Sequence, residues 1–276
     1  MKVTVLCDNN TLIDRYFVGE PGLSLYIEDE GATILYDCGY SKVFIDNAQK
    51  MGIDLLNVDY IVFSHGHLDH TWGFLNLVQL YTEAVLEKKP HKKPTIIAHP
   101  HVFLSRYDTE LAEAGSLISQ ERAASLFQLQ LSKQEQWITK RLVFLGQIQG
   151  KRKGMNMVTT LRTEPEQPDN ILDDSALAFK GKEGTVVLSG CSHSGITNIV
   201  EAAKKLTGVS NTRDVIGGFH TLDYTEEERK ELALYFKENA IKDCHPCHCT
   251  DLRAKCALSS VCNVHEVGVG LSLEYQ

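Results

Sequence analysis

Short apolar runs separated by turn residues predict strands in the first third of the chain. Residues 1–7 form the first run, and residues 23–27 and 33–36 flank Gly31 as in a hairpin. Residues 60–63 are apolar, which is typical of a buried strand, and residues 95–98 form a further short strand. In the second half, the apolar runs 175–179 and 185–188 predict another hairpin, and residues 214–216 a following strand.

Segments with helical pattern or composition lie between these strands. We expect helices over residues 41–51, 74–86, 111–131, 196–206 and 226–239. Ser41 and Gly52 are suitable start and stop residues for the first of them, and the 111–131 segment is rich in strong helix formers. Alternation of strands and helices in both halves predicts a layered α/β fold.

The densest group of chemically active residues follows the strand at 60–63. His65, His67, Asp69 and His70 fall within six positions. An extended chain points His65 and His67 to the same side, and a turn into the next helix would bring Asp69 and His70 to the same cavity. Imidazole and carboxylate groups bind zinc, iron or manganese. The motif therefore predicts parts of two metal sites about 3.5–4 Å apart.

Three later strand ends carry further candidates. They are Gly190-Cys191-Ser192-His193, Gly217-Gly218-Phe219-His220 and His248-Cys249-Thr250. The adjacent glycines before His220 allow close approach of the backbone to a ligand, and His220 is either a general acid/base, an anion contact or a structural residue.

Composition and charge narrow the function. The chain has 276 residues, and we expect a single domain over 1–276. Its net charge of −8 argues against general nucleic-acid binding. No apolar run reaches the length of a membrane span, so we expect no membrane partner. Eight cysteines without a secretory segment indicate reduced thiols and a cytoplasmic location.

Together with Leu35-Tyr36-Asp37-Cys38-Gly39, these motifs resemble the metallo-β-lactamase-fold superfamily, and most closely its dihydropterin–aminobenzene-phosphate synthase-like branch. The resemblance implies an α/β fold, a four-layer αββα sandwich with the site at one edge. It also implies that Asp37 supports the metal loop by hydrogen bonding, although a simple turn residue would look the same.

The resemblance implies two ligand sets. His65 and His67 with His193 would bind one ion, and Asp69 and His70 with His248 the second. Cys191 stands where most members have a bridging aspartate. Either its thiolate binds metal, which would favour softer ions, or His193 is the ligand and Cys191 only packs; we expect His193.

The expected function is that of a metal-dependent hydrolase or transferase acting on a small, anionic, phosphorylated or pyrophosphorylated substrate. We expect zinc, in one or two ions, with manganese or iron as alternatives, and catalytic roles for Asp69 and His220. A redox or sensor protein using Cys244, Cys247, Cys249, Cys256 and Cys262 is the alternative, and a non-catalytic scaffold a third.

Three weaker candidates remain. His99 and His101 lie at a strand end, and either is a ligand or a structural residue. Asp173 and Asp174 precede a strand and are either ligands or turn residues. The basic segment 150–154 is either an anion contact or a solvated loop.

Overall fold

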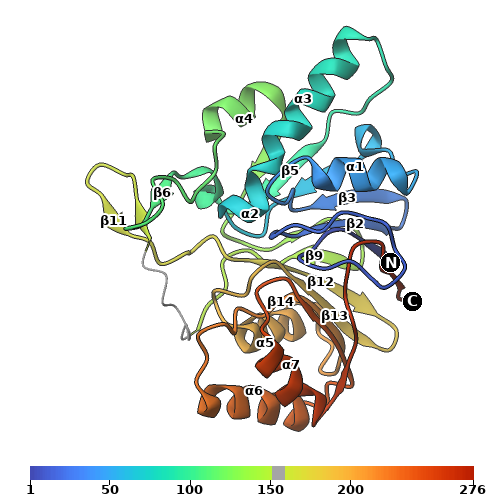
Figure 1. The fold of residues 1–276 in the computed structure, drawn as a ribbon, viewed down its shortest axis with the longest axis vertical. Coiled ribbons are helices and arrows are strands. Elements are labelled where there is room, and N and C mark those ends of the chain that lie inside the picture. The colour runs from blue at the N-terminus through green and yellow to red at the C-terminus, as the bar shows by residue number, and fades with distance from the viewer. Residues whose placement is uncertain (151–158) are drawn as a thin grey trace.

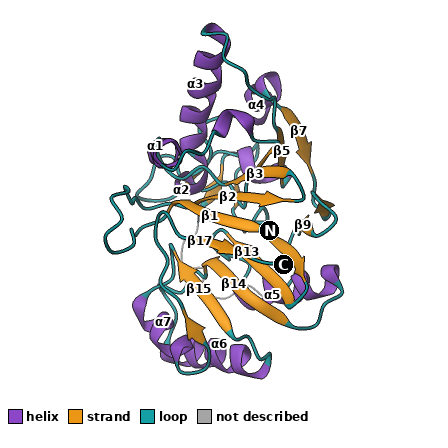
Figure 2. Cartoon of the chain, turned by 90° about the vertical axis from the view of Figure 1, so that its right-hand side faces the viewer, coloured by secondary structure: helices purple, strands orange, loops and turns teal. Residues whose placement is uncertain are grey.

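The computed structural model describes residues 1–150 and 159–276. Two seven-stranded sheets lie face to face, with helices on the outer side of each (Figures 1 and 2). The first sheet has the order β17 (Ser272–Glu274), β1 (Lys2–Cys7), β2 (Ser24–Asp29), β3 (Ala32–Tyr36), β4 (Tyr60–Val62), β5 (Thr95–Ala98) and β7 (Gln128–Leu131). The second has the order β16 (Asn263–Val264), β15 (Asp243–Cys247), β14 (Thr212–Gly218), β13 (Gly184–Ser189), β12 (Ala176–Gly181), β9 (Leu142–Phe144) and β8 (Gln136–Trp137).

Each sheet combines an antiparallel part with a parallel part. Strands β3, β4, β5 and β7 run parallel, as do β13, β14, β15 and β16. The carboxyl ends of parallel strands meet at one edge, and ligand sites of α/β proteins gather there. A small third sheet consists of β11 (Gln167–Pro168), β10 (Thr160–Leu161) and β6 (Arg106–Tyr107).

The helices cover the outer faces of the two large sheets (Figure 1). Helices α1 (Val43–Lys50), α3 (Gly73–Leu86) and α4 (Gln120–Leu126) lie over the first sheet, and α5 (Ile196–Thr207), α6 (Glu226–Glu238) and α7 (Leu252–Ser259) over the second. Shorter helical turns are α2 (Leu68–Thr71), η1 (Leu55–Asn57) and η2 (Pro100–Phe103).

Three apolar clusters hold these layers together. The central cluster joins the sheets and includes Leu25 and Ile34 from the first and Leu177 and Leu188 from the second, all fully buried. One cluster lies between the first sheet and its helices, and another lies between the second sheet and its helices. Burial of apolar surface on both faces of each sheet explains the near-continuous apolar runs, and the four-layer αββα expectation is confirmed.

Most predicted elements are confirmed within one or two residues, including both hairpins and the helices at 74–86, 196–206 and 226–239. The helix expected over 111–131 is wrong. Only Gln120–Leu126 is helical, with Ser119 as its N-cap, and Gln128–Leu131 is strand β7. Pairing of β7 with β5 outweighs the helix propensity of that segment.

The basic segment at 150–154 falls outside the described residues from Lys151 onward. Over the two ranges that the structure describes, no helix has the length and apolar character needed to cross a bilayer.

Candidate metal centre

The candidate site lies where the carboxyl ends of the parallel strands from the two sheets meet. The motif with three histidines follows β4, whereas Cys191 and His193 follow β13, His220 follows β14 and His248 follows β15. The register of the second sheet pairs Ser189 with Gly217 and Gly218 with Cys247, so the loops after these strands start side by side. The sheet pairing therefore brings together residues that are more than a hundred positions apart.

One set of possible ligands consists of His65, His67 and His193. One ring nitrogen from each lies within 4.8 Å of the others, and all three rings are buried. His65 Nε2 is 3.1 Å from His67 Nδ1. His67 Nε2 and both ring nitrogens of His193 are buried without a hydrogen-bond partner among the described residues. Buried polar atoms are normally paired, and a bound metal ion would satisfy these nitrogens.

A second set consists of Asp69, His70 and His248, whose donor atoms also lie within 4.8 Å of one another. The Nε2 atoms of His70 and His248 are 3.2 Å apart. Asp69 Oδ2 lies 3.3 Å from His248 Nε2 and 3.8 Å from His70 Nε2. Imidazole with carboxylate is a normal donor set for zinc or iron, so both sets fit a divalent ion.

Outer hydrogen bonds orient the rings of both sets. Asp37 Oδ2 is 2.7 Å from His70 Nδ1 and accepts a 2.6 Å hydrogen bond from Ser64 Oγ, which is 2.9 Å from His65 Nδ1. His248 Nδ1 is 3.2 Å from Asn9 Oδ1. The Nδ1 atoms of these three histidines therefore face supporting groups and their Nε2 atoms face the site. This arrangement is usual for histidines that bind metals, and it gives Asp37 the supporting contact expected from the sequence.

The histidines of the first set are neutral near pH 7. Burial lowers the pKa of His67 to about 3, and it lowers the pKa of His65 and His193 well below the ordinary value. Neighbouring imidazoles and Arg106 lower the pKa of His65 and His193 further. Because a metal ion binds the unprotonated imidazole, these residues need not lose a proton first.

The second set differs from the first because it contains a carboxylate, that of Asp69. Burial alone would raise the pKa of Asp69, but His70 and His248 lower it, so the carboxylate is ionised. Burial alone would lower the pKa of His248, but Cys249 and Asp69 raise it to about 9. An environment that stabilises positive charge at His248 would also stabilise a bound cation.

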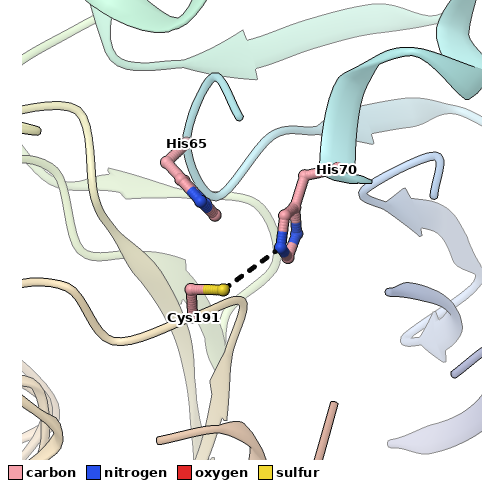
Figure 3. Close-up of side chains that lie close together, drawn as sticks. All are labelled: His65, His70 and Cys191. Carbon is pink, nitrogen blue, oxygen red and sulfur yellow. Dashed lines mark hydrogen bonds between the residues drawn. The ribbon is translucent and has the colours of Figure 1, made fainter. Parts of the chain in front are cut away.

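Two thiols belong to the same site. Cys191 Sγ lies 3.3 Å from His70 Nε2 and 3.2 Å from His248 Nε2. Figure 3 shows Cys191 pointing toward His70 from the turn after β13, with His65 beside them. Burial alone would raise the pKa of the Cys249 thiol, but a hydrogen bond with Cys191 and the charge of His248 lower it well below its ordinary value.

Buried carboxylates outside the two sets shape the loops. Asp173 accepts a 2.7 Å hydrogen bond from the backbone N–H of Gly66, between His65 and His67, and forms an ion pair with the fully buried Arg106. Asp174 accepts hydrogen bonds from the backbone and hydroxyl of Ser194. Neither aspartate belongs to a possible ligand set in the described chain, so this pair holds loops in place.

A cavity of about 430 Å³ opens onto these residues. Its walls combine polar groups of the site with apolar side chains, namely Pro21, Tyr40, His67, Leu68, Asp69, Cys191, His193, His220, Leu222, His248 and Cys249. This volume suits a small molecule. Among the described residues that line it there is no lysine or arginine, so histidine is the one residue type of its wall that can carry a positive charge.

The structure brings the residues of both expected ligand sets and His220 to one place. His220 faces the cavity, its ring centre 4.2 Å from that of His193, and its Nδ1 has no hydrogen-bond partner among the described residues. His99 and His101 do not join the site; His99 Nε2 is 3.3 Å from Gln147 Oε1 and His99 Nδ1 accepts from the backbone of His101.

The five cysteines at 244–262 do not form one cluster. Cys249 lies at the site and Cys247 packs between the sheets. Cys244 Sγ and Cys262 Sγ are 3.4 Å apart on the other side of the sheet, and Cys256 is exposed. In the described chain no set of three ligands includes Cys244, Cys256 or Cys262.

Sequence reasoning missed three contributions. Asp8 and Asn9 belong to no motif named above, but Asp8 Oδ1 accepts a 2.9 Å hydrogen bond from the backbone N–H of His248. Arg106 belongs to no motif that the sequence shows. The thiol of Cys249 has an expected role only in the alternative redox or sensor function. The available signal was the position of Asp8 directly after the strand β1 and of Cys249 two residues after the strand β15.

Comparison with known proteins agrees with the fold. Residues 18–122 match the model of the metallo-beta-lactamase superfamily. The chain is 27% identical to 7,8-dihydropterin-6-methyl-4-(beta-D-ribofuranosyl)-aminobenzene-5'-phosphate synthase of Methanocaldococcus jannaschii, over 92% of this chain and 89% of the relative. It is 28% identical to an uncharacterized protein of the same organism, with 95% of each chain covered.

A solved structure has the same architecture. The crystal structure of Tm1679, described as a metal-dependent hydrolase of the beta-lactamase superfamily, superposes with a TM-score of 0.81 at 26% identity. The match covers 99% of this chain and 98% of that one. With its αββα layers and its clustered histidines at the expected edge, the chain has the metallo-β-lactamase fold, matches the superfamily's model over residues 18–122, and resembles the dihydropterin–aminobenzene-phosphate synthase-like members.

Proposed function

We propose that this protein is an enzyme that uses one or two bound divalent ions, zinc in the first place, to hydrolyse or transfer a phosphate or pyrophosphate group of a small molecule. His65, His67 and His193 would hold one ion. His70 and His248, with Asp69 beside them, would hold the second. The observation that carries the proposal is the set of buried ring nitrogens without partners at His67 and His193, next to a cavity of about 430 Å³.

A bound divalent ion supplies Lewis acidity toward a phosphate oxygen and lowers the pKa of water near it. The protein's own groups have separate roles. Asp69 lines the cavity as an ionised carboxylate and can accept a proton from an attacking water or amine. His220, on the opposite loop, can donate a proton to a leaving oxygen.

The support for a phosphorylated substrate comes from two sources. The relative from Methanocaldococcus jannaschii is named as the synthase of a compound that carries a 5'-phosphate. The apolar wall of the cavity, which includes Tyr40, Leu68 and Leu222, suits a substrate with one uncharged ring or chain beside its anionic group.

Metal analysis of the purified protein tests this function. We expect about one to two equivalents of divalent metal, and His67→Ala should lose part of it together with phosphoesterase or transferase activity. His101→Ala is the matched control, since His101 lies outside both ligand sets, and it should retain metal and activity. Full metal retention in His67→Ala, or absence of metal from the wild type, would overturn the proposal.

The pair Cys244 and Cys262 supports a second candidate function, redox sensing, because their sulfurs are only 3.4 Å apart. A peroxide could oxidise the two thiols to one disulfide, with the peroxide reduced to water. Thiol titration after peroxide treatment should then show two thiols fewer than before in the wild type and no such paired loss in Cys262→Ser. Equal losses in both proteins would exclude this function.

A further inference from the structure

The two thiols of the site lie against ring nitrogens, unlike the other buried cysteines. Cys38 and Cys247 pack inside the apolar clusters on either side of the first sheet. Cys191 and Cys249 belong to no apolar cluster of the described chain. Cys191 Sγ instead lies within 3.3 Å of the Nε2 atoms of both His70 and His248. A small apolar role, the usual role of a buried cysteine, does not explain this placement.

Cys249 is a further possible ligand beside Cys191 and His248. Its sulfur, Cys191 Sγ and a ring nitrogen of His248 all lie within 4.8 Å of one another. The backbone N–H of His220 donates to Cys249 Sγ at 3.3 Å. Space for the sulfur depends on Gly218, where a Cβ atom would lie 2.6 Å from Cys249 Sγ. The end of β14 is therefore shaped around this thiol.

The histidines of the group are held in the orientation of ligands. Asp37 contacts His70 Nδ1 and Asn9 contacts His248 Nδ1, so both Nε2 atoms point toward Cys191. Two sulfurs and two imidazole nitrogens form a Cys2His2 donor set, which is a normal set for a four-coordinate zinc ion. The first set, with three histidines, leaves a fourth position open as in catalytic zinc sites.

We propose that Cys191, Cys249, His70 and His248 together bind the second metal ion as a closed, thiolate-containing site. The proposal rests on the proposed function, because it assumes that the protein holds metal at this edge. The open coordination position, where substrate would bind, then belongs to the ion held by His65, His67 and His193. Asp69 binds neither ion and is free to exchange protons. Thiolate ligands select zinc or iron over manganese and magnesium.

Cobalt substitution tests the assignment without any substrate. The protein is stripped with a chelator under reducing conditions and loaded with Co²⁺; bound metal is counted and the near-ultraviolet thiolate-to-cobalt absorption is recorded. We expect about two equivalents in the wild type, with the absorption band. Cys191→Ser/Cys249→Ser should bind about one equivalent without the band, whereas His67→Ala should bind about one and keep the band. Cys256→Ser, at an exposed position on α7, should match the wild type.

The outcomes separate this proposal from the proposed function. Two equivalents of cobalt without the band, or a double variant that retains both metal and band, would overturn the thiolate ligands while leaving the metal function intact. Failure of the wild type to bind any metal would overturn both. If the double variant does not fold, as judged by circular dichroism, Cys249→Ser alone should show a weakened band, and an unchanged band would again contradict the proposal.

Discussion

The carboxylate of Asp37 lies 2.7 Å from Nδ1 of His70, and both side chains are fully buried. The same carboxylate accepts hydrogen bonds from the backbone N–H and the hydroxyl of Ser64, at 2.7 and 2.6 Å. Asp37 therefore connects the end of β3 to Ser64, in the loop after the strand β4, and to the helix α2. In this way Asp37 fixes the position of the segment 64–70 and the direction in which the Nε2 atom of His70 points.

Asp37→Asn tests this connection. Asp37 has a φ of 57°, a left-handed conformation that asparagine adopts readily, so the backbone should be retained. The amide cannot stabilise His70 as a charged acceptor does, and metal affinity should fall about 10–100-fold. Competition with a chromogenic chelator measures the change. Asp46→Asn, on the exposed side of α1, is the control, and equal affinities of the two variants would contradict the role of Asp37.

Arg106→Leu should be strongly destabilising. Arg106 is fully buried, with ion pairs to Asp169 at 3.2 Å and Asp173 at 3.1 Å. Removing the guanidinium leaves buried carboxylates without a counter-ion, which costs about 3–5 kcal/mol of the free energy of unfolding. Urea unfolding, monitored by fluorescence, measures this loss in the free energy of unfolding.

Lys230→Leu is the matched control for Arg106→Leu. Lys230 forms an ion pair with Glu226 on α6, but both side chains are mostly exposed. Loss of such a pair changes stability by about 0.3–0.5 kcal/mol. If the two variants are equally stable, Arg106 does not hold the loop of Asp173 as the structure indicates.

The local parts of this site could be predicted from the residues themselves, His193 and His248 were expected only through the family resemblance, and the distant supporting contacts could not be predicted. Spacing within residues 64–70 is enough to indicate metal binding, since all donors lie on one turn. The contact of Arg106 with Asp173 spans 67 positions and that of Asp8 with His248 spans 240. Such contacts follow from strand order in the sheets, which apolar periodicity does not determine.

The segment 111–131 shows the same limit for the fold. Its composition favours helix, yet Gln128–Leu131 pairs with β5 along its whole length. A strand that completes the edge of a sheet gains hydrogen bonds and burial that local propensity does not include. The contact of Cys249 with Cys191 could not be predicted for a related reason, because it depends on the ends of β13 and β15 lying on either side of β14 in one sheet.

Asp69→Asn separates proton transfer from metal binding. We expect the variant to keep its full metal content, because the four ligands proposed for the second ion do not include Asp69. Turnover of a phosphate ester should fall about 10²–10⁴-fold, the usual contribution of a positioned acid or base. Elemental analysis and steady-state kinetics are measured on the same preparation. A variant with less metal would instead make Asp69 a ligand.

Asp243→Asn should reveal a pH-dependent contribution to stability at the start of β15. Burial alone would raise the pKa of Asp243, but hydrogen bonds from His265, Asn263 and Arg213 lower it to about 2. The unfolded chain has the ordinary value of about 3.9, so the folded state favours the ionised form and the unfolded state binds more protons in between. The stabilisation is therefore complete above about pH 5 and is lost as the pH falls toward 2.

We accordingly expect wild type to unfold at a higher urea concentration than Asp243→Asn at pH 7 and 5, with the difference shrinking between pH 4 and 3. The difference should be modest and should decrease in high salt, since the ion pair with Arg213 is partly solvent-exposed. Asp46→Asn, which alters an exposed pair on α1, controls for the change in net charge. A difference that stays constant down to pH 3 would show that Asp243 stabilises β15 through its neutral hydrogen bonds and not through its charge.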